Sequence, residues 1–226
     1  ERMRREFTAN VSHELKTPLQ SIIGSAELLE NGLVEPEDQP RFLNRIHQEA
    51  DRLVALINDI LRLSQLDEGG ALPHEQVSVL ELAQEAARSL TAQAAAQAVH
   101  ISVTGTAGTV FGVRRLLYEI ARNLCENAVK YNVPGGSVTV EVAETDRDVT
   151  LLVRDTGIGI PEGDQSRVFE RFYRVDKSHS RAIGGTGLGL SIVKHAVAYH
   201  HGTLRLESQP GKGTVITVTL PKEPTE

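Results

Sequence analysis

The stretch that decides the fold of the first part of this chain is Asn10-Val11-Ser12-His13-Glu14-Leu15-Lys16-Thr17-Pro18-Leu19. Apolar residues in and around it recur every three or four positions, which predicts one helix with a buried stripe. The stripe consists of Met3, Phe7, Val11, Leu15, Leu19, Ile22, Ala26, Leu29 and Leu33. His13 lies two positions from Val11 and two from Leu15, about 200° around the helix axis. Its imidazole is therefore predicted to project into solvent.

The neighbours of His13 fit a histidine that acts as a nucleophile. A neutral imidazole attacks through one ring nitrogen, and Glu14 is placed to accept a hydrogen bond from the other. Thr17 follows one turn later on the same face, where its hydroxyl can orient a water near a phosphorylated imidazole and so serve hydrolysis. Pro18 lacks the amide hydrogen that would bond the Glu14 carbonyl, so we expect a bend after this turn.

This constellation resembles the phosphoacceptor box of two-component sensor histidine kinases. The residues that carry the resemblance are Phe7, Asn10, His13, Glu14, Lys16, Thr17, Pro18 and Leu19. Lys16 stands where many members of that family carry Arg, which keeps the charge. The resemblance implies that ATP phosphorylates the histidine, which then passes the phosphoryl group to an aspartate of a response regulator. Thr17, by the same family pattern, implies phosphatase activity toward that regulator.

Length and composition bound the class of protein. The chain has 226 residues, 40% of them hydrophobic, which suffices for one large or two small globular domains. The net charge of -6 argues against a general binder of nucleic acid or anionic membranes. The single cysteine, Cys125, excludes an internal disulfide, and we interpret it as a small apolar residue in a helix rather than a catalytic thiol.

The sequence contains neither a signal peptide nor an apolar run of about 18 residues. It opens at Glu1, without a methionine and already in a helical pattern. We therefore expect a fragment of a longer protein, whose other parts hold the sensing and membrane segments. The family resemblance implies the cytoplasmic portion of a membrane-anchored bacterial sensor.

A second apolar stripe follows the turn-rich stretch 31–40 and predicts a helical hairpin. Its heptad positions are Phe42, Ile46, Leu53, Leu56, Ile60 and Leu63, widened by Leu43, Ala50, Ile57 and Leu61. Each helix carries more apolar surface than one partner covers, so we expect two chains to form a dimeric four-helix bundle. A monomeric hairpin packed on the following domain is the alternative.

The helical periodicity ends at the run Asp-Glu-Gly-Gly-Ala-Leu-Pro, residues 67–73, which predicts a domain boundary. We assign 1–67 to a dimerisation and phosphotransfer domain, 68–75 to a hinge linker and 76–222 to a second, mixed domain. Helices are predicted there over 79–98 and 113–131, and strands over 100–103, 109–111, 137–143, 149–154, 202–208 and 213–220. The predicted fold class is thus α+β multidomain, a helical hairpin followed by an α/β layer structure.

A polar face on the second of these helices carries Asn123, Asn127, Lys130 and Tyr131. Such a face can bind a nucleotide, because the Asn127 amide oxygen suits a magnesium ion, Lys130 suits phosphates and Tyr131 can lie against a base. Taken alone, the pattern favours an ordinary amphipathic helix with a buried tyrosine.

Two glycine-rich segments add to this site. Asp155 ends a strand before Gly157 and Gly159, where its carboxylate can accept hydrogen bonds from an exocyclic amine, although Asp-Gly turns are common. The second segment opens an apolar helix and offers bare amide donors to phosphates. Its residues are Gly185, Thr186, Gly187, Leu188 and Gly189.

A polar stretch joins the two glycine segments and has the composition of a mobile lid. It begins with Val168-Phe169-Glu170-Arg171-Phe172-Tyr173-Arg174 and continues through Asp176, Lys177, Ser178, His179, Ser180 and Arg181 to Gly184. Arg171 and Arg174 are candidates to meet phosphates, and Phe169 and Phe172 are expected to anchor its base.

In their order, these four segments resemble the asparagine box, first glycine box, phenylalanine-rich box and second glycine box of histidine kinases. The resemblance implies the α/β sandwich of gyrase, Hsp90 and MutL, with ATP and Mg²⁺ bound, Asn127 on the metal and Asp155 selecting adenine. Those ATPases carry Glu where this chain has Asn123, so transfer to water should be slow and His13 becomes the expected acceptor. A degenerate nucleotide-binding module without chemistry and an ATP-driven chaperone or repair clamp are the alternatives.

Overall fold

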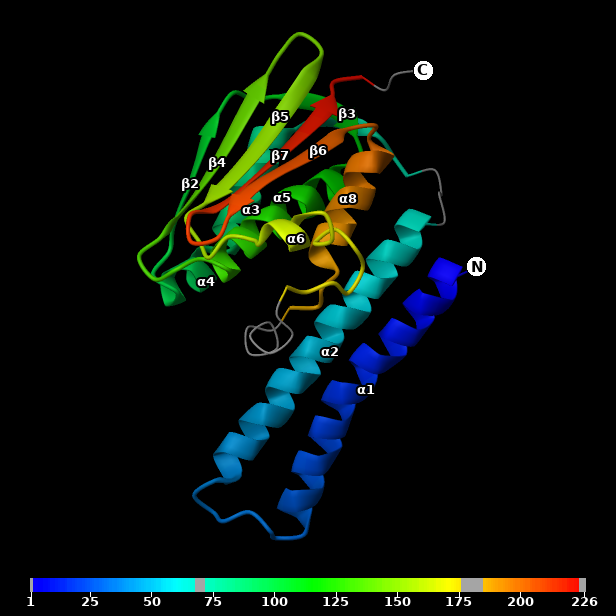
Figure 1. Ribbon diagram of the computed structural model, residues 1–226, viewed down its shortest axis with the longest axis vertical. Helices are drawn as coiled ribbons and strands as arrows, with labels where there is room; N and C mark the ends of the chain where they lie inside the picture. Colours follow the sequence, from blue (N-terminus) through cyan, green and yellow to red (C-terminus); the bar gives the residue numbers. More distant parts are fainter. Residues whose placement is uncertain (1, 68–71, 176–184, 224–226) are drawn as a thin grey trace. The chain divides into compact units, whose positions relative to one another are not determined.

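The computed structural model describes residues 2–67, 72–175 and 185–223 (Figure 1). The chain divides into two compact units, one built on residues 1–62 and the other on the residues from 63 onward, except that 184–186 group with the first. Within the described residues, no helix is both long and apolar enough to cross a membrane.

The first unit is the predicted helical hairpin, α1 (Arg2–Glu30) and α2 (Gln39–Asp67). α1 ends at a glycine cap, because Gly32 takes a φ of 65° and two backbone bonds close the last turn. These bonds run from Gly32 N to Leu29 O at 3.2 Å and from Leu33 N to Leu28 O at 3.0 Å. Pro40 lies in the first turn of α2, where a helix needs no N–H donor.

Polar contacts link the two helices of the hairpin at a heptad spacing. Arg45 donates from Nε to Ser21 Oγ at 3.1 Å, and Arg52 Nη2 lies 3.9 Å from Glu14 Oε2. The partners are seven residues apart on each helix, so the same antiparallel register repeats after two turns. The loop and the apolar pattern predicted the hairpin, and the structure adds its register.

The predicted apolar stripe is not wholly covered within one chain. Leu19 and Leu33 remain 49% and 71% exposed, although both belong to the predicted stripe. On both helices further large apolar side chains are exposed, namely Ile23, Leu28, Leu43, Val54, Ile57 and Leu61. This exposure agrees with the expectation that each helix carries more apolar surface than one partner helix can cover.

The second unit is an α/β sandwich with helices on one face of a five-stranded sheet (Figure 1). The strand order is β2-β4-β5-β7-β6, with β2 parallel to β4 and the other pairs antiparallel. The strands are β2 (His100–Gly105), β4 (Ser137–Glu144), β5 (Asp148–Asp155), β6 (Thr203–Gln209) and β7 (Gly213–Pro221). The covering helices are α3 (Val79–Ser89), α5 (Arg114–Lys130) and α8 (Gly189–Tyr199).

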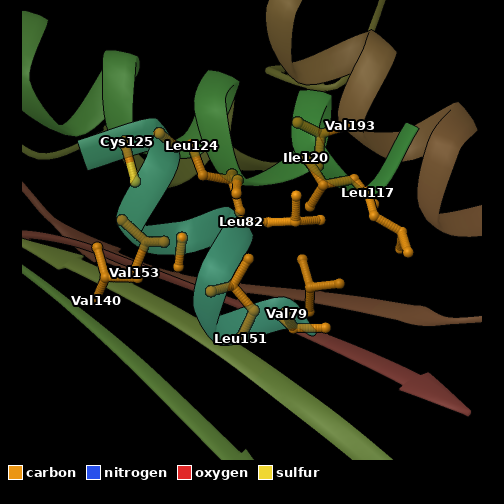
Figure 2. Packing of buried hydrophobic residues seen from close by; sticks show 14 of the residues in the cluster. Val79, Leu82, Leu117, Ile120, Leu124, Cys125, Val140, Leu151, Val153 and Val193 are labelled. Carbon is orange, nitrogen blue, oxygen red and sulfur yellow. The ribbon is translucent and has the colours of Figure 1, made fainter. Parts of the chain in front are cut away.

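The core of this unit lies between the sheet and the helices (Figure 2). Alternate residues of the strands face it, as a period of two requires, with Val140 opposite Val153 and Leu151 opposite Val218. Cys125 is buried there, and burial raises its pKa to about 12. A thiol kept neutral in this way is no nucleophile, which agrees with the interpretation of Cys125 as an apolar core residue.

The predicted helix over 79–98 is interrupted, which corrects that expectation. It divides at Leu90 into α3 and the short α4 (Thr91–Ala96). At the break Ser89 Oγ donates to the Ala86 carbonyl at 2.7 Å and Thr91 Oγ1 to the Arg88 carbonyl at 2.9 Å. Hydroxyl groups that compete for helix carbonyls loosen a helix, and a periodicity of apolar residues does not reveal this.

Three short elements complete the unit. β1 (Glu75–Ser78) pairs with β3 (Thr109–Gly112) in a separate antiparallel ribbon, and α6 (Glu162–Gln165) follows the first glycine segment. The sequence predicted β3 but neither β1 nor α6. Elements of four residues are too short to show a period.

His200 is a buried polar group that ties α8 to the start of α5. Its Nε2 accepts a hydrogen bond from Val113 N at 3.0 Å, and its Nδ1 donates to the Ala196 carbonyl at 2.7 Å. Both bonds need a neutral ring with its proton on Nδ1. Burial lowers the pKa of His200 below its ordinary value of 6.5.

This lowered pKa predicts acid sensitivity of the second unit. The unfolded state binds a proton at His200 near pH 6.5 while the folded state resists it, so the free energy of unfolding falls as the pH drops through 6.5. One such group contributes a slope of at most about 1.4 kcal/mol per pH unit. In urea titrations between pH 5.5 and 7.5, His200→Gln is expected to be less stable at pH 7.5 but to show a shallower slope. Equal slopes in the two proteins would contradict this assignment.

Candidate functional site

His13 is exposed on α1, on the face predicted for it. Val11 and Leu15, two residues away on either side, are half-buried and face the hairpin. The Glu14 carboxylate is half-buried and lies 3.9 Å from Arg52 Nη2 on α2. That Glu14 accepts a hydrogen bond from the His13 imidazole stays a prediction.

Thr17 occupies the same helix face one turn after His13. Its hydroxyl donates to the His13 carbonyl at 3.3 Å, a long bond that the side chain can exchange for a water. Pro18 is buried, and α1 continues through it to Glu30. This region therefore presents an imidazole and a hydroxyl side by side on an otherwise regular helix.

In the second unit, Asn123 joins the polar face of α5 to the start of α8. Its side chain is 8% exposed, and Nδ2 donates to the Glu119 carbonyl at 2.8 Å and to Glu119 Oε2 at 3.3 Å. A Cβ on Gly189 would lie 2.8 Å from Asn123 Oδ1. A side chain at the first residue of α8 would therefore displace the buried Asn123 amide, and the glycine at position 189 avoids this.

Asn127, Lys130 and Tyr131 are half-buried at the end of α5. In the described part of the chain, the Asn127 side chain makes no hydrogen bond, so its amide oxygen is available to a ligand. Lys130 Nζ lies 5.9 Å from the Tyr131 ring centroid. The Tyr131 carbonyl accepts from Ile158 N at 3.1 Å and thereby joins α5 to the first glycine segment.

Asp155 stands at the end of β5, as predicted. Its Oδ1 accepts hydrogen bonds from Gly157 N at 2.8 Å and Thr214 N at 3.2 Å. Burial raises the pKa of this carboxyl, and the two backbone bonds oppose the rise. No donor among the described residues reaches Oδ2, which can therefore receive a donor from a ligand.

The first glycine segment is packed against its surroundings. A Cβ on Gly157 would lie 2.2 Å from the Tyr131 carbonyl oxygen, so the end of α5 itself requires glycine here. Two further bonds hold the segment to the turn between β6 and β7, from Gly211 N to Ile158 O and from Ile160 N to Ser208 Oγ, both at 2.8 Å. Gly159 lies between these two bonds.

A side-chain network that the sequence analysis did not identify supports Asp155. Asn132 Nδ2 donates to the Ala128 and Ser137 carbonyls, both at 3.0 Å, and Thr156 Oγ1 donates to Asn132 Oδ1 at 3.2 Å. Ser137 N in turn donates to Thr156 Oγ1 at 2.9 Å. The signal available in the sequence was an Asn just after a helix and a Thr just after a strand, both typical of local capping.

The start of the predicted lid is bonded to the second glycine segment. Phe172 takes a φ of 65°, and its N donates to the Gly187 carbonyl at 2.8 Å. Arg171 Nη2 lies 3.1 Å from His195 Nε2 on α8. Tyr173 donates from its hydroxyl to the Asp164 carboxylate, which raises the pKa of Tyr173. Phe169, Phe172 and Arg174 are half-buried, in keeping with an anchored base.

The rest of the predicted lid, from Asp176 to Gly184, lies outside the described residues. Gly185 and Thr186 are half-buried ahead of Gly187, and Leu188 is fully buried. α8 begins at Gly189, so the second glycine segment opens a helix as predicted. Its first-turn amides give that end of α8 a partial positive charge suited to an anion.

The structure thus brings several parts of the predicted nucleotide site together in the second unit, which includes the second glycine segment from Gly187 onward. Direct contacts join Asn123 with Gly189, Tyr131 with Gly157 and Phe172 with Gly187. These three contacts do not include Asn127 or Arg174, both of which are half-buried.

Two family models match this chain. Residues 3–69 match the His Kinase A (phospho-acceptor) domain, and residues 112–224 match the histidine kinase-, DNA gyrase B- and HSP90-like ATPase. The second unit is therefore of an ATP-binding type, in agreement with its α/β sandwich.

Curated relatives share this organisation. The chain is 42% identical to the sensor-like histidine kinase SenX3 of Mycolicibacterium smegmatis over 99% of its own length and 59% of that protein. It is 37% identical to the sensor histidine kinase WalK of Bacillus subtilis over 96% of its length and 36% of that protein. The chain thus spans well under two thirds of the length of these relatives.

Solved structures agree with the fold. Full-length ShkA in complex with AMPPNP matches with a TM-score of 0.69 and 28% identity over 96% of this chain and 45% of that one. ThkA in complex with the response regulator protein TrrA matches with a TM-score of 0.77 over 97% of this chain and 62% of that one. The identity is 23%, so this likeness supports the fold alone. With both domain models matched in this order and close relatives along its whole length, the chain belongs to the sensor histidine kinase family.

Proposed function

We propose that this chain is the catalytic core of a histidine kinase, in which ATP bound by the second unit phosphorylates His13. The observation that carries the proposal is the exposed His13 imidazole, which lies in a phosphoacceptor-type hairpin that precedes an ATPase-type unit. The phosphoryl group then passes to an aspartate of a response regulator, and Thr17 supports its hydrolytic removal from that regulator.

The chemistry at His13 follows from the imidazole. A lone pair on one ring nitrogen forms the N–P bond as the bond from the γ-phosphorus to the ADP oxygen breaks, and ADP leaves with that electron pair. Positive charge develops on the ring, and Glu14 is placed next in sequence to accept the hydrogen of the other nitrogen. The half-buried position of Glu14 favours this role, since a partly desolvated carboxylate stabilises a nearby cation more strongly.

The second unit holds the nucleotide at both ends. Asp155 Oδ2 accepts a hydrogen bond from the exocyclic amine of adenine, because Oδ1 already accepts two from backbone donors. The phosphates face the start of α8, where Thr186, Gly187 and Leu188 lead into the helix and Arg171 and Lys130 supply charge. Gly185 and Gly189 keep this loop free of bulky side chains.

Magnesium is the expected companion of ATP, and Asn127 fits it. Its half-buried amide oxygen makes no bond to the described part of the chain, and Mg²⁺ accepts one protein oxygen together with substrate phosphates and water. The described residues contain no group of three or more His, Cys, Asp or Glu that could hold a metal ion unaided. The ion would neutralise charge on the phosphates, and Asn127 would hold it there.

Residue 123 favours transfer over hydrolysis. An amide cannot accept a proton from water as a carboxylate does, and the Nδ2 of Asn123 is already bonded to Glu119. Position 123 therefore offers no base that would activate water, and we propose that the acceptor is the protein nucleophile His13.

The hairpin is the proposed site of dimerisation and of regulator docking. Exposed Leu43, Val54, Ile57 and Leu61 on α2 are the surface that a second copy would cover in a four-helix bundle. Because the chain belongs to the sensor histidine kinase family, we propose the receiver domain of a response regulator as its partner. Residues 68–75 would act as the hinge between domains 1–67 and 76–222, and 68–71 lie outside the described residues. We place the chain on the cytoplasmic side of a larger sensor protein.

His13→Gln is expected to abolish autophosphorylation without loss of nucleotide binding, because only the nucleophile is removed. The measurement is incubation with γ-labelled ATP and Mg²⁺, followed by a test of whether protein-bound label resists base and is lost in acid. The matched control is His47→Gln, which changes another highly exposed histidine of the hairpin. Acid-labile label on the His13 variant would refute the assignment. If the wild type binds ATP but takes up no label, a nucleotide-binding module without kinase activity would be favoured.

Asp155→Asn is expected to fold and to change base preference. The Asn oxygen must take the place of Oδ1 to accept from Gly157 N and Thr214 N, so the amide nitrogen meets the adenine amine, donor against donor. The affinity for ATP should fall about 100-fold. Inosine triphosphate has a carbonyl in place of the adenine amine, so the affinity for it should fall far less. Isothermal titration with both nucleotides tests this, and an equal loss for the two would argue against the assigned contact.

Thr17→Ala is expected to leave autophosphorylation of His13 intact and to slow release of phosphate from the phosphorylated regulator roughly 100-fold. The hydroxyl positions water and does not touch the attacking nitrogen. Thr17→Ser retains the hydroxyl and should retain most of the activity. The assay follows decay of the phosphorylated regulator that the wild-type protein produces, and an unchanged decay rate with the alanine variant would exclude this role.

A further inference from the structure

The strongest unassigned feature of the second unit is the imidazole of His195, whose two ring nitrogens both have defined partners. His195 lies on α8 and is half-buried. Its Nδ1 is 2.7 Å from the carbonyl oxygen of Ser191, one turn earlier, and Ser191 is fully buried. A carbonyl only accepts, so the proton of the neutral ring is on Nδ1 and the Nε2 lone pair points away from α8.

Arg171 supplies the partner for that lone pair. Its Nη2 lies 3.1 Å from His195 Nε2, and a guanidinium can only donate. The two bonds of the ring are therefore consistent with one tautomer alone. A guanidinium carries five N–H donors in a planar fork, and the geometry of that fork suits phosphate oxygens.

The contact lies at the start of the phosphate-binding loop. Phe172, the residue after Arg171, donates its backbone N–H to Gly187, and Ser191 Oγ donates to the Leu188 carbonyl at 2.7 Å. The chain at 171–172 is thus held to the second glycine segment by its backbone and to α8 by a side chain. A long arginine side chain loses much rotamer freedom when it is held in this way, and that cost is met before the nucleotide binds.

We infer that His195 is a positioning residue, which holds the Arg171 guanidinium at the start of α8 for the phosphates of the bound nucleotide. The inference rests on the proposed function for the identity of the nucleotide. His195 itself touches no phosphate, and it acts only through Arg171. It extends the site to a helix face that none of the four sequence motifs includes.

A matched pair of variants tests the inference. His195→Gln places an amide oxygen near the position of Nε2 and keeps the acceptor, whereas His195→Asn can reach Ser191 but leaves no acceptor for Arg171. In the intact chain, His195→Asn should raise the Kd for Mg-ATP about tenfold, and His195→Gln should restore it to within about twofold of the wild type. Adenosine, which has no phosphate, should bind both variants as it binds the wild type.

Two further readouts distinguish positioning from loss of structure. In an Arg171→Ala background, His195→Asn should have no additional effect on the Kd for Mg-ATP, because the group it positions is gone. Equal weakening of adenosine and ATP, or an effect that persists without Arg171, would overturn the inference in favour of a merely structural role. If the wild type and His195→Asn bind ATP equally well, the inference is overturned and the proposed function stands. A wild-type chain that binds no ATP overturns the proposed function, and the inference falls with it.

Discussion

One carboxylate oxygen holds the nucleotide-binding unit together at its site. Oδ1 of Asp155 accepts backbone hydrogen bonds from Gly157 and Thr214, so one side chain joins the end of β5, the loop after it and the start of β7. Burial raises the pKa of this carboxyl, and the two N–H donors offset only part of that rise. The same loop is also bonded to the end of α5 through the Tyr131 carbonyl. The carboxylate proposed to select adenine and the helix proposed to hold the metal are therefore joined by direct backbone contacts.

A second constraint links chemistry to packing at α8. Asn123 uses its amide to bond Glu119 and to receive the first residue of α8, and His195 on the same helix holds Arg171. The groups proposed to surround the phosphates are thus placed by neighbouring side chains of the protein. Such support lowers the entropic cost of binding, since the donors are oriented before the nucleotide arrives. It also leaves no carboxylate at position 123 to activate water, in keeping with a protein nucleophile at His13.

Several elements followed directly from periodicity, and others did not. The hairpin of α1 and α2, the long helix α5 and the β6–β7 hairpin lie within a few residues of their predicted bounds, because each has a long apolar pattern and a glycine or polar turn at its ends. The break at Leu90 was missed because it depends on hydroxyl groups bonding carbonyls. β1 was missed because four residues acquire strand geometry only by pairing with β3.

The sequence by itself determined the order of the two units, the exposed face of His13 and the positions of the glycine segments, since these depend on local spacing and on residue type. Tertiary structure alone decided which donors Asp155 receives, why Gly157 and Gly189 have no side chain, and which residues support the site from behind. Asn132, Thr156 and His195 belong to this last group. Thr156 with Asn132 and His195 with Arg171 are each 24 residues apart along the chain, and only folding of the sheet and helices brings these atoms together.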